Sequence, residues 1–223
     1  MTNNDERPFI YTPPDEPYLT VLHQDEDILV LDKPSGLLSV PGRPLEHRDC
    51  LASRAQERFP SATVVHRLDL DTSGVIVMAL HRKAHRHLGL QFERRKTKKS
   101  YVARVWGQVE GDEGRVDLPL TIDWPNRPKH IVDHDTGRPS QTDWQVIERE
   151  AQATRMRLTP ITGRSHQLRV HMLALGHPII GDPLYAPDEA FHAAPRLQLH
   201  AESLTLHHPK DGELVTFTVP CPF

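Results

Sequence analysis

The stretch from residue 64 to residue 80 places a polar loop between two apolar segments. Val64 and Val65 form the end of one expected strand, and the β-branched run 75–80 predicts a second strand that is buried on both faces. The loop between them carries an Arg, two Asp, a Thr and a Ser, and it ends at Gly74. A polar loop held between two buried strands can aim catalytic side chains, so we expect the rest of the chain to support this loop.

Two periodicities alternate along the chain and indicate a mixed fold. Alternating or β-branched apolar residues predict strands at 18–23, 28–31, 99–109, 115–120, 130–133, 142–148, 154–159, 196–206 and 214–219. Apolar residues at spacings of three and four predict helices at 49–59, 82–95 and 163–175. This order predicts an α+β fold with a mixed, mainly antiparallel central sheet flanked by a few helices. Residues 1–17, with four Pro, are expected to form an extended N-terminal arm, and residues 18–223 a single domain.

The composition excludes several classes of protein. The longest apolar run, 75–80, has six residues, whereas a membrane helix needs about 20. The N-terminus lacks the basic and then apolar pattern of a signal peptide. Cys50 and Cys221 form no metal or redox motif. We therefore expect a cytoplasmic protein without disulfides or membrane contact.

Charge is unevenly distributed along the chain. The formal net charge is -3, but residues 1–32 hold eight acids and one base, and residues 82–104 hold nine bases and one acid. This segregation predicts an electropositive face on a mildly acidic protein, which suits a nucleic-acid partner. From charge alone, a solvated helix and turn explain residues 82–104 at least as well.

Asp69 and Asp71 are the carboxylates of the polar loop. Asp71, Thr72 and Ser73 are residues that favour turns, so Asp69 is the stronger catalytic candidate. An aspartic protease-like hydrolase is an alternative, because the loop resembles the Asp-Thr/Ser-Gly loop of that class. Here an additional residue precedes Gly74 and no second such loop exists, so the required carboxylate pair would need a dimer.

Neither a metal nor a cofactor is expected. His81 and His85 have the helical spacing of metal ligands, but no His-Glu-x-x-His motif is present. The chain also lacks the glycine-rich loops that bind nucleotide cofactors.

Two residues elsewhere in the chain complement Asp69. Arg169, in the third expected helix, would keep the Asp69 carboxylate ionised if that helix packs under the loop. Tyr101 follows a run of bases, and an aromatic among cations is typical of a site where a nucleobase stacks while phosphates are neutralised. A core strand residue with its hydroxyl at the surface is an equally good interpretation of Tyr101.

Three separated motifs, which together span nearly the whole chain, resemble those of the RluA family of RNA pseudouridine synthases. The first, 33–42, contains Lys-Pro-Ser-Gly-Leu followed by Val-Pro-Gly. The second, 66–74, reads His-Arg-Leu-Asp-Leu-Asp-Thr-Ser-Gly. The third, 163–185, contains Gly-Arg-Ser-His-Gln-Leu-Arg-Val-His and Gly-Asp-Pro-Leu-Tyr, with Ser165 where many members have Thr.

The resemblance implies the pseudouridine synthase catalytic fold and isomerisation of uridines in RNA without cofactor or metal. It implies that Asp69 is the catalytic aspartate, that Arg169 forms an ion pair with it, and that Arg67 enters the space left by a flipped nucleotide. Tyr101 resembles the tyrosine that stacks on the target base and takes the C5 proton. We assign RNA binding to bases of the loop, the basic run and the third motif: His66, Arg67, Lys96, Lys98, Lys99 and Arg164.

Segments 37–42 and 123–129 resemble the dual-specificity subgroup, which acts on a 23S rRNA hairpin and on the anticodon stem-loop of tRNA. Asp71 matches the wider family better than this subgroup. The short chain leaves no room for the S4-like RNA-binding domain of several relatives, and we expect a monomer without an obligatory protein partner. A non-catalytic RNA-binding module is the second hypothesis, but it needs no intact set of Asp69, Tyr101 and Arg169, and all three are present.

Overall fold

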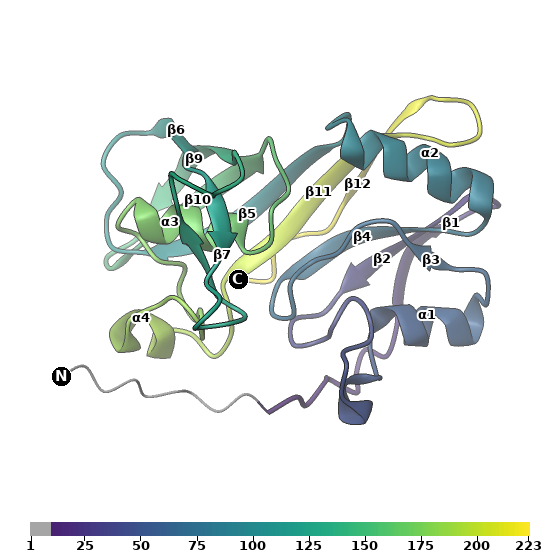
Figure 1. The fold of residues 1–223 in the computed structure, drawn as a ribbon, viewed down its shortest axis with the longest axis horizontal. Coiled ribbons are helices and arrows are strands. Elements are labelled where there is room, and N and C mark those ends of the chain that lie inside the picture. Colours follow the sequence, from purple (N-terminus) through teal and green to yellow (C-terminus); the bar gives the residue numbers. More distant parts are fainter. Residues whose placement is uncertain (1–9) are drawn as a thin grey trace.

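The computed structural model describes residues 10–223 (Figure 1). The first nine residues of the predicted arm lie outside the described residues. The helices are α1 Leu51–Arg58, α2 Arg82–Glu93, α3 Gln167–Ala174 and α4 Asp188–His192, with a short 3-10 helix η1 at Leu45–His47. The strands are β1 Thr20–Gln24, β2 Ile28–Lys33, β3 Thr63–Val64, β4 Ser73–Ala79, β5 Lys98–Trp106, β6 Glu113–Asp117, β7 Leu120–Ile122, β8 His130–Val132, β9 Gln141–Arg149, β10 Ala153–Pro160, β11 Leu199–His207 and β12 Leu214–Thr218.

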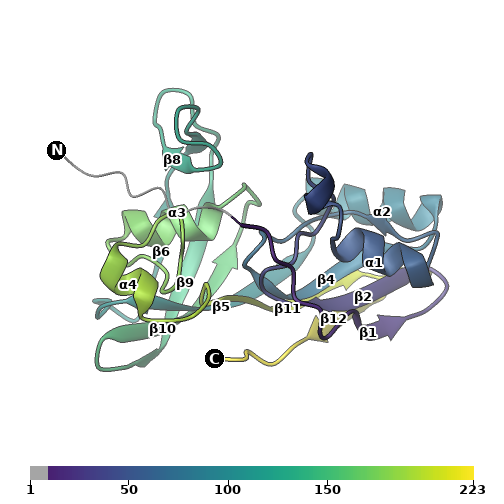
Figure 2. The ribbon, with the colours of Figure 1, turned by 90° about the horizontal axis from the view of Figure 1, so that it is seen from below.

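One ten-stranded sheet forms the backbone of the fold, in the order β1-β2-β4-β11-β5-β10-β9-β6, with β12 beside β11 and β3 beside β4. Its pairings are antiparallel except that of β4 with β11, which confirms the predicted mixed, mainly antiparallel sheet. Figure 2 shows α1, α2 and α3 on the same side of this sheet. The small β7–β8 hairpin projects beyond α3 on that side (Figure 2). A functional site between the helices is therefore lined by residues from different parts of the chain.

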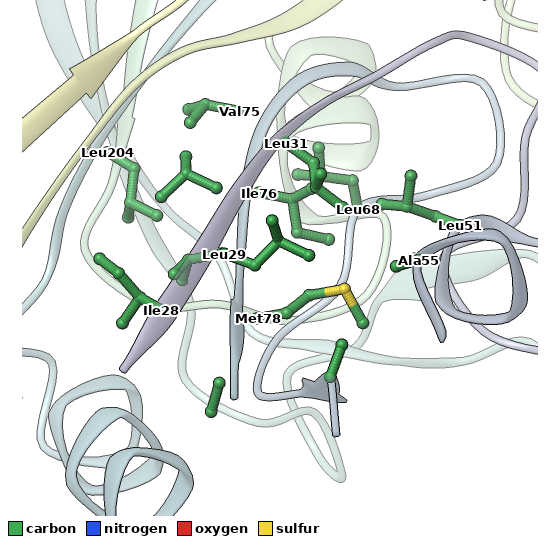
Figure 3. Close-up of a cluster of buried hydrophobic side chains, with 14 of the residues drawn as sticks. Ile28, Leu29, Leu31, Leu51, Ala55, Leu68, Val75, Ile76, Met78 and Leu204 are labelled. Atoms are coloured by element: carbon green, nitrogen blue, oxygen red, sulfur yellow. The ribbon is translucent and has the colours of Figure 1, made fainter. Parts of the chain in front are cut away.

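Two buried clusters divide the interior. The first core packs β2 and β4 against α1, and its Ile28, Leu31, Ile76 and Met78 are at most 1% exposed (Figure 3). The second core packs β5 and β10 against α3. Tyr101 packs against both clusters, because β5 lies between them in the sheet. A site beside Tyr101 can therefore draw residues from both halves of the molecule.

The parallel contact between β4 and β11 joins the two halves and depends on Gly74. This residue has φ +114°, a conformation that side chains rarely adopt, and a Cβ here would lie 2.3 Å from the Ala201 carbonyl oxygen. Glycine is therefore the residue that lets the two backbones approach this closely directly after the polar loop.

Two expected elements differ from the structure and one helix was not expected, each for a local reason. The predicted strand 115–120 is divided into β6 and β7 because Pro119 has no N–H for the ladder. Helix α3 begins at Gln167 and not at Gly163, since the Thr162 hydroxyl and the Arg164 N–H donate to the Gln167 side chain and hold the preceding residues as a loop. Helix α4 was not predicted, because five residues are too few to show a helical repeat.

The described part of the arm lies against α1. The Tyr11 hydroxyl donates to the Asp49 carbonyl oxygen at 2.6 Å. Arg54, whose side chain is 1% exposed, pairs with the Asp49 carboxylate and donates to the Pro14 carbonyl oxygen at 2.8 Å. Residues of the predicted arm are thus tied to the first core by a buried guanidinium.

Candidate active site

Hydrogen bonds from residues of the first motif anchor the polar loop between β3 and β4. Lys33, the last residue of β2, is fully buried, and its Nζ donates to the carbonyl oxygens of Pro34, Leu37 and Leu70 at 2.9, 2.7 and 2.8 Å. The carbonyl of Leu70 lies between the two loop carboxylates in the chain, so Lys33 fixes the backbone that carries Asp69. Burial lowers the pKa of Lys33 to about 7, although the nearby aspartates act in the opposite direction.

Two serines of the same motif complete this anchor. The Ser35 hydroxyl donates to the Asp71 carbonyl oxygen at 2.7 Å. The Ser39 hydroxyl donates to the Leu68 carbonyl oxygen at 2.7 Å and accepts from the Leu68 N–H at 3.1 Å. The loop is therefore hydrogen-bonded on both sides of Asp69, which restricts the positions that its carboxylate can reach.

The two loop carboxylates, of Asp69 and Asp71, lie in different environments. Asp69 is 27% exposed at its side chain and lines a cavity of about 580 Å³, whereas Asp71 does not line it. Burial raises the pKa of Asp71, against the opposing effect of Arg169 and Lys33. A solvent-accessible carboxylate that faces a cavity can meet a substrate, so Asp69 is the reactive candidate of the pair.

Arg169 forms the ion pair with Asp69 that the sequence predicted, and it also has a closer partner that the sequence did not predict. Its Nη1 lies 3.8 Å from Asp69 Oδ2. Its Nε and Nη2 donate to the two carboxylate oxygens of the fully buried Asp182 at 2.7 and 2.6 Å. Burial alone would lower the pKa of Arg169, but the hydrogen bonds and charge of Asp182 raise it above the ordinary value. Asp182 thus holds a permanent positive charge beside Asp69.

Sequence reasoning missed Asp182, although it stands in the Gly-Asp-Pro segment of the third motif. Its carboxylate also accepts from the N–H groups of Leu184 and Tyr185 at 2.9 and 3.1 Å. An Asp between Gly and Pro is typical of a turn, and that interpretation hides its second role. The signal that could have revealed it is the presence of an arginine and an aspartate in one motif.

Tyr101 lies in the wall of the same cavity, on β5. Burial raises the pKa of its hydroxyl, and the negative charge of Asp69 adds to this effect. The phenol is therefore neutral near pH 7. The ring, packed against both cores, presents a flat surface of the kind on which a base can stack.

The cavity contains most of the predicted site residues. Asp69, Tyr101 and Arg169 line it together with these predicted RNA-binding residues: His66, Arg67, Lys99 and Arg164. Lys96 and Lys98 do not line it; both are exposed, Lys96 in the segment that joins α2 to β5 and Lys98 at the start of β5. The Nε of Arg164 is buried without a hydrogen-bond partner in the described part of the chain, so a donor is available at the cavity for an anionic group.

His66 has a structural contact that was not expected. Its ring stacks on Phe92 of α2 at 4.3 Å between centroids, and its Nε2 accepts from the Val77 N–H at 3.1 Å. Burial, with a smaller contribution from Lys99, lowers the pKa of His66 to about 3. A neutral, fixed imidazole adds no charge for RNA binding and instead positions the neighbouring, exposed Arg67.

Within residues 10–223, no group of three or more His, Cys, Asp or Glu side chains could hold a metal ion. No helix in the same range is long and apolar enough to cross a membrane.

Comparisons with known proteins agree with this fold. A sequence model of the RNA pseudouridylate synthase family matches residues 27–174, and the chain belongs to this family. It is an enzyme that isomerises uridines in RNA.

Similar proteins match along nearly the whole chain. A dual-specificity RNA pseudouridine synthase RluA from Salmonella typhi is 60% identical over 214 residues, which is 96% of this chain and 98% of the relative. The protein of that name from Escherichia coli K12 is 59% identical over the same shares of the two chains. Among solved structures, human RNA pseudouridylate synthase domain containing 1 has a TM-score of 0.76 and 29% identity, and the match covers 92% of this chain and 84% of that one.

Proposed function

We propose that this pseudouridine synthase modifies uridines in two RNAs, a 23S rRNA hairpin and the anticodon stem-loop of tRNA. Bacterial relatives that carry the dual-specificity name are about 60% identical over almost the full length of both chains. The segments 37–42 and 123–129, which resemble that subgroup, support the same assignment.

The observation that carries the mechanism is one accessible carboxylate, Asp69, facing a cavity beside a buried guanidinium 3.8 Å away. Neither the glycosidic carbon nor the ring of a stacked uridine can be reached, so the target nucleotide leaves the RNA stack and enters the cavity. Ionised Asp69 then assists cleavage of the C1′–N1 bond, as a nucleophile at C1′ or as a base at the sugar.

The remaining steps need no group from outside the enzyme and RNA. The released uracil keeps the electron pair of the broken bond, rotates in the cavity and forms a new bond from C5 to C1′. The C5 proton leaves last, and N1 gains a proton, so the product is an isomer of the substrate. Arg169, fixed by Asp182, places a positive charge 3.8 Å from the Asp69 carboxylate.

Tyr101 is assigned to stacking on the target base and to the final proton transfer. Because burial raises its pKa, the neutral hydroxyl takes the C5 proton only as its own proton passes on to another acceptor. Arg67 is exposed at the mouth of the cavity and fills the space that the flipped nucleotide leaves. Arg164, Lys99, Lys96 and Lys98 neutralise the backbone phosphates on either side.

We also propose that residues 18–223 act as a single catalytic domain and that the enzyme works as a cytoplasmic monomer without an obligatory protein partner. The composition of the chain, whose longest apolar run has six residues, supports this assignment. Sedimentation equilibrium of the purified protein, with and without an anticodon stem-loop transcript, tests it: a protein mass that doubles would contradict the monomer.

Asp69→Asn tests the mechanism, with Asp71→Asn as the matched control in the same loop. Conversion of uridine to pseudouridine in both transcripts should fall by at least about 1000-fold for Asp69→Asn, since only an ionised carboxylate can perform the first step. RNA affinity in a filter-binding assay should change little. Asp71→Asn should stay within about tenfold of the parent, because Asp71 lies outside the cavity. Turnover by Asp69→Asn at the parental rate would refute the assignment.

The choice of substrates has its own test. Pseudouridine is mapped in tRNA and ribosomal RNA from cells that lack the gene, with and without a plasmid that restores it. Sites that disappear from both RNAs and return together support dual specificity. Loss from only one class of RNA would restrict the enzyme to that class and leave the catalytic assignment intact.

A further inference from the structure

We infer that His166, which the motif analysis left without a role, donates a hydrogen bond from its Nε2–H to a carbonyl oxygen of the uracil in the cavity. This inference rests on the proposed function and extends it to the base itself. It is carried by three observations: the hydrogen bonds of the ring, the backbone conformation of the residue, and its place in the cavity.

The hydrogen bonds define which nitrogen of His166 carries the proton. The Tyr185 hydroxyl accepts from the His130 N–H at 2.7 Å and lies 2.7 Å from His166 Nδ1. A hydroxyl has one proton, and in this arrangement that proton is satisfied by donation to Nδ1. The Nδ1 of His166 is therefore an acceptor, and the proton of the neutral ring sits on Nε2.

The backbone of His166 is held in an unusual conformation. The residue precedes α3 with φ +55° and ψ +14°, the left-handed region that non-glycine residues seldom occupy. Edge contacts of its ring with Tyr185 and His130, at 5.6 and 5.1 Å between centroids, stabilise this arrangement. Strained residues of this kind are concentrated at functional sites, and His166 lines the cavity.

The position of the ring leaves its Nε2 edge for a ligand. His166 lines the cavity of Asp69 and Tyr101, whereas Tyr185 lines a separate cavity behind it, with the β7–β8 hairpin. Within residues 10–223, the hydrogen bond of the His166 ring is made by Nδ1 and not by Nε2. The edge that bears Nδ1 faces Tyr185, so Nε2–H is the polar group that the ring can offer to the cavity.

The charges around His166 agree with a neutral donor. Burial lowers the pKa of His166 to about 4. The surrounding charged groups act in both directions: Asp69 and Asp182 favour protonation, and Arg169 and His130 oppose it. At neutral pH the imidazole therefore donates a hydrogen bond without adding a charge that would compete with Arg169 for Asp69.

A neutral donor in this position suits the reaction. When the C1′–N1 bond breaks, negative charge spreads over the uracil and its carbonyl oxygens O2 and O4, and a preorganised N–H stabilises that charge. The rotation that exchanges N1 for C5 turns the ring about its N3–C6 axis. The same rotation exchanges O2 for O4, so one fixed donor contacts a carbonyl oxygen both before and after it.

Two amide variants separate this role from a structural one. The side chain of Gln carries an N–H near the place of imidazole Nε2, whereas the shorter Asn can replace Nδ1 as acceptor for Tyr185 and tolerates the left-handed conformation. At saturating RNA, His166→Asn should lower the single-turnover rate about 100-fold, and His166→Gln should recover at least about tenfold of that loss. RNA affinity by filter binding and the thermal unfolding midpoint should stay close to parental values.

Tyr185→Phe supplies an independent measurement at the residue behind the ring. The imidazole stays in place, but without the Tyr185 hydroxyl its proton can sit on either ring nitrogen. The rate should therefore fall less than for His166→Asn, by about tenfold. His166→Asn within about threefold of the parental rate would overturn the inference, and so would equal losses for Asn and Gln. The parent enzyme and Asp69→Asn are assayed in parallel. If the parent forms no pseudouridine, the proposed function fails. If the parent is active and His166→Asn is unaffected, only the present inference is refuted.

Discussion

Lys33 and Arg169 are both cations buried in the interior beside the catalytic loop, but their partners differ. Lys33 belongs to the first core and donates to three uncharged carbonyl oxygens. Arg169 belongs to α3, beside the second core, and donates to the Asp182 carboxylate. Burial lowers the pKa of the lysine to about 7, whereas the carboxylate raises that of the arginine.

The two anchors therefore perform different tasks. Lys33 fixes the shape of the loop, since it donates to the carbonyl oxygens of Pro34 and Leu37, on either side of the Pro-Ser-Gly turn, and to that of Leu70 in the loop. Arg169 supplies charge, because its Nη1 is directed to Asp69 at 3.8 Å while Asp182 holds the other side of the guanidinium. One half of the molecule positions the carboxylate and the other half places a positive charge beside it.

The largest stability effect is expected from Asp182→Asn. Removal of the carboxylate strands a buried guanidinium, which costs about 3–5 kcal/mol of unfolding free energy. Asp112→Asn is the matched control, because Asp112 forms an ion pair with Arg149 at 2.9 Å while its side chain is 87% exposed. Such exposed pairs contribute at most about 1 kcal/mol. Urea unfolding measures both, and equal losses would contradict the distinction between buried and exposed pairs.

A smaller loss is expected from Lys33→Met, about 2 kcal/mol at neutral pH. The carbonyls of Pro34 and Leu37 lose their donor, but Leu70 still accepts from the Gly36 N–H at 3.1 Å, and the cost of burying an ammonium group disappears. Lys210→Met, at an exposed turn, should leave stability unchanged within about 0.5 kcal/mol. Activity of Lys33→Met should fall further than its stability explains, because the loop loses its anchor; full activity would show that the serines suffice.

The contrast between the two anchors also marks the limit of sequence reasoning. The run 75–80 predicted β4, which spans Ser73–Ala79, because six consecutive apolar residues after a polar loop leave few alternatives. The family resemblance predicted that Asp69, Tyr101 and Arg169 act in one site. The structure places all three in one cavity. Their catalytic roles remain predictions.

What the sequence could not show are the partners of buried charges. Lys33 follows an apolar strand and precedes a Pro-Ser-Gly turn, where a lysine is ordinarily exposed. Its complete burial depends on carbonyls that reach it from Leu37 and from Leu70, a segment 37 residues away in the chain. Asp182 received no role for a similar reason, since only the packing of α3 brings Arg169 to it.

The smallest expected effect is a pH dependence of stability that belongs to Lys33 alone. Its folded pKa is about 7, whereas a lysine in an unfolded chain has a pKa of about 10.4. Between these values the unfolded state binds more protons, so the free energy of unfolding rises with pH, by at most about 1.4 kcal/mol per unit. Below about pH 7 both states are protonated and this dependence disappears. Arg169 is charged in both states over this range and contributes no slope.

Urea unfolding of the parent and of Lys33→Met at about pH 7 and pH 9 isolates this contribution, since other titrating groups, including Lys99, cancel in the difference. Because the folded pKa of Lys33 is close to the lower pH, the parent should gain about 2 kcal/mol relative to the variant on going to the higher pH. Asp182→Asn should follow the parent, because its arginine does not titrate. Parallel curves for the parent and Lys33→Met would show that the ammonium group keeps its proton despite burial, so that three carbonyl acceptors alone stabilise a buried charge.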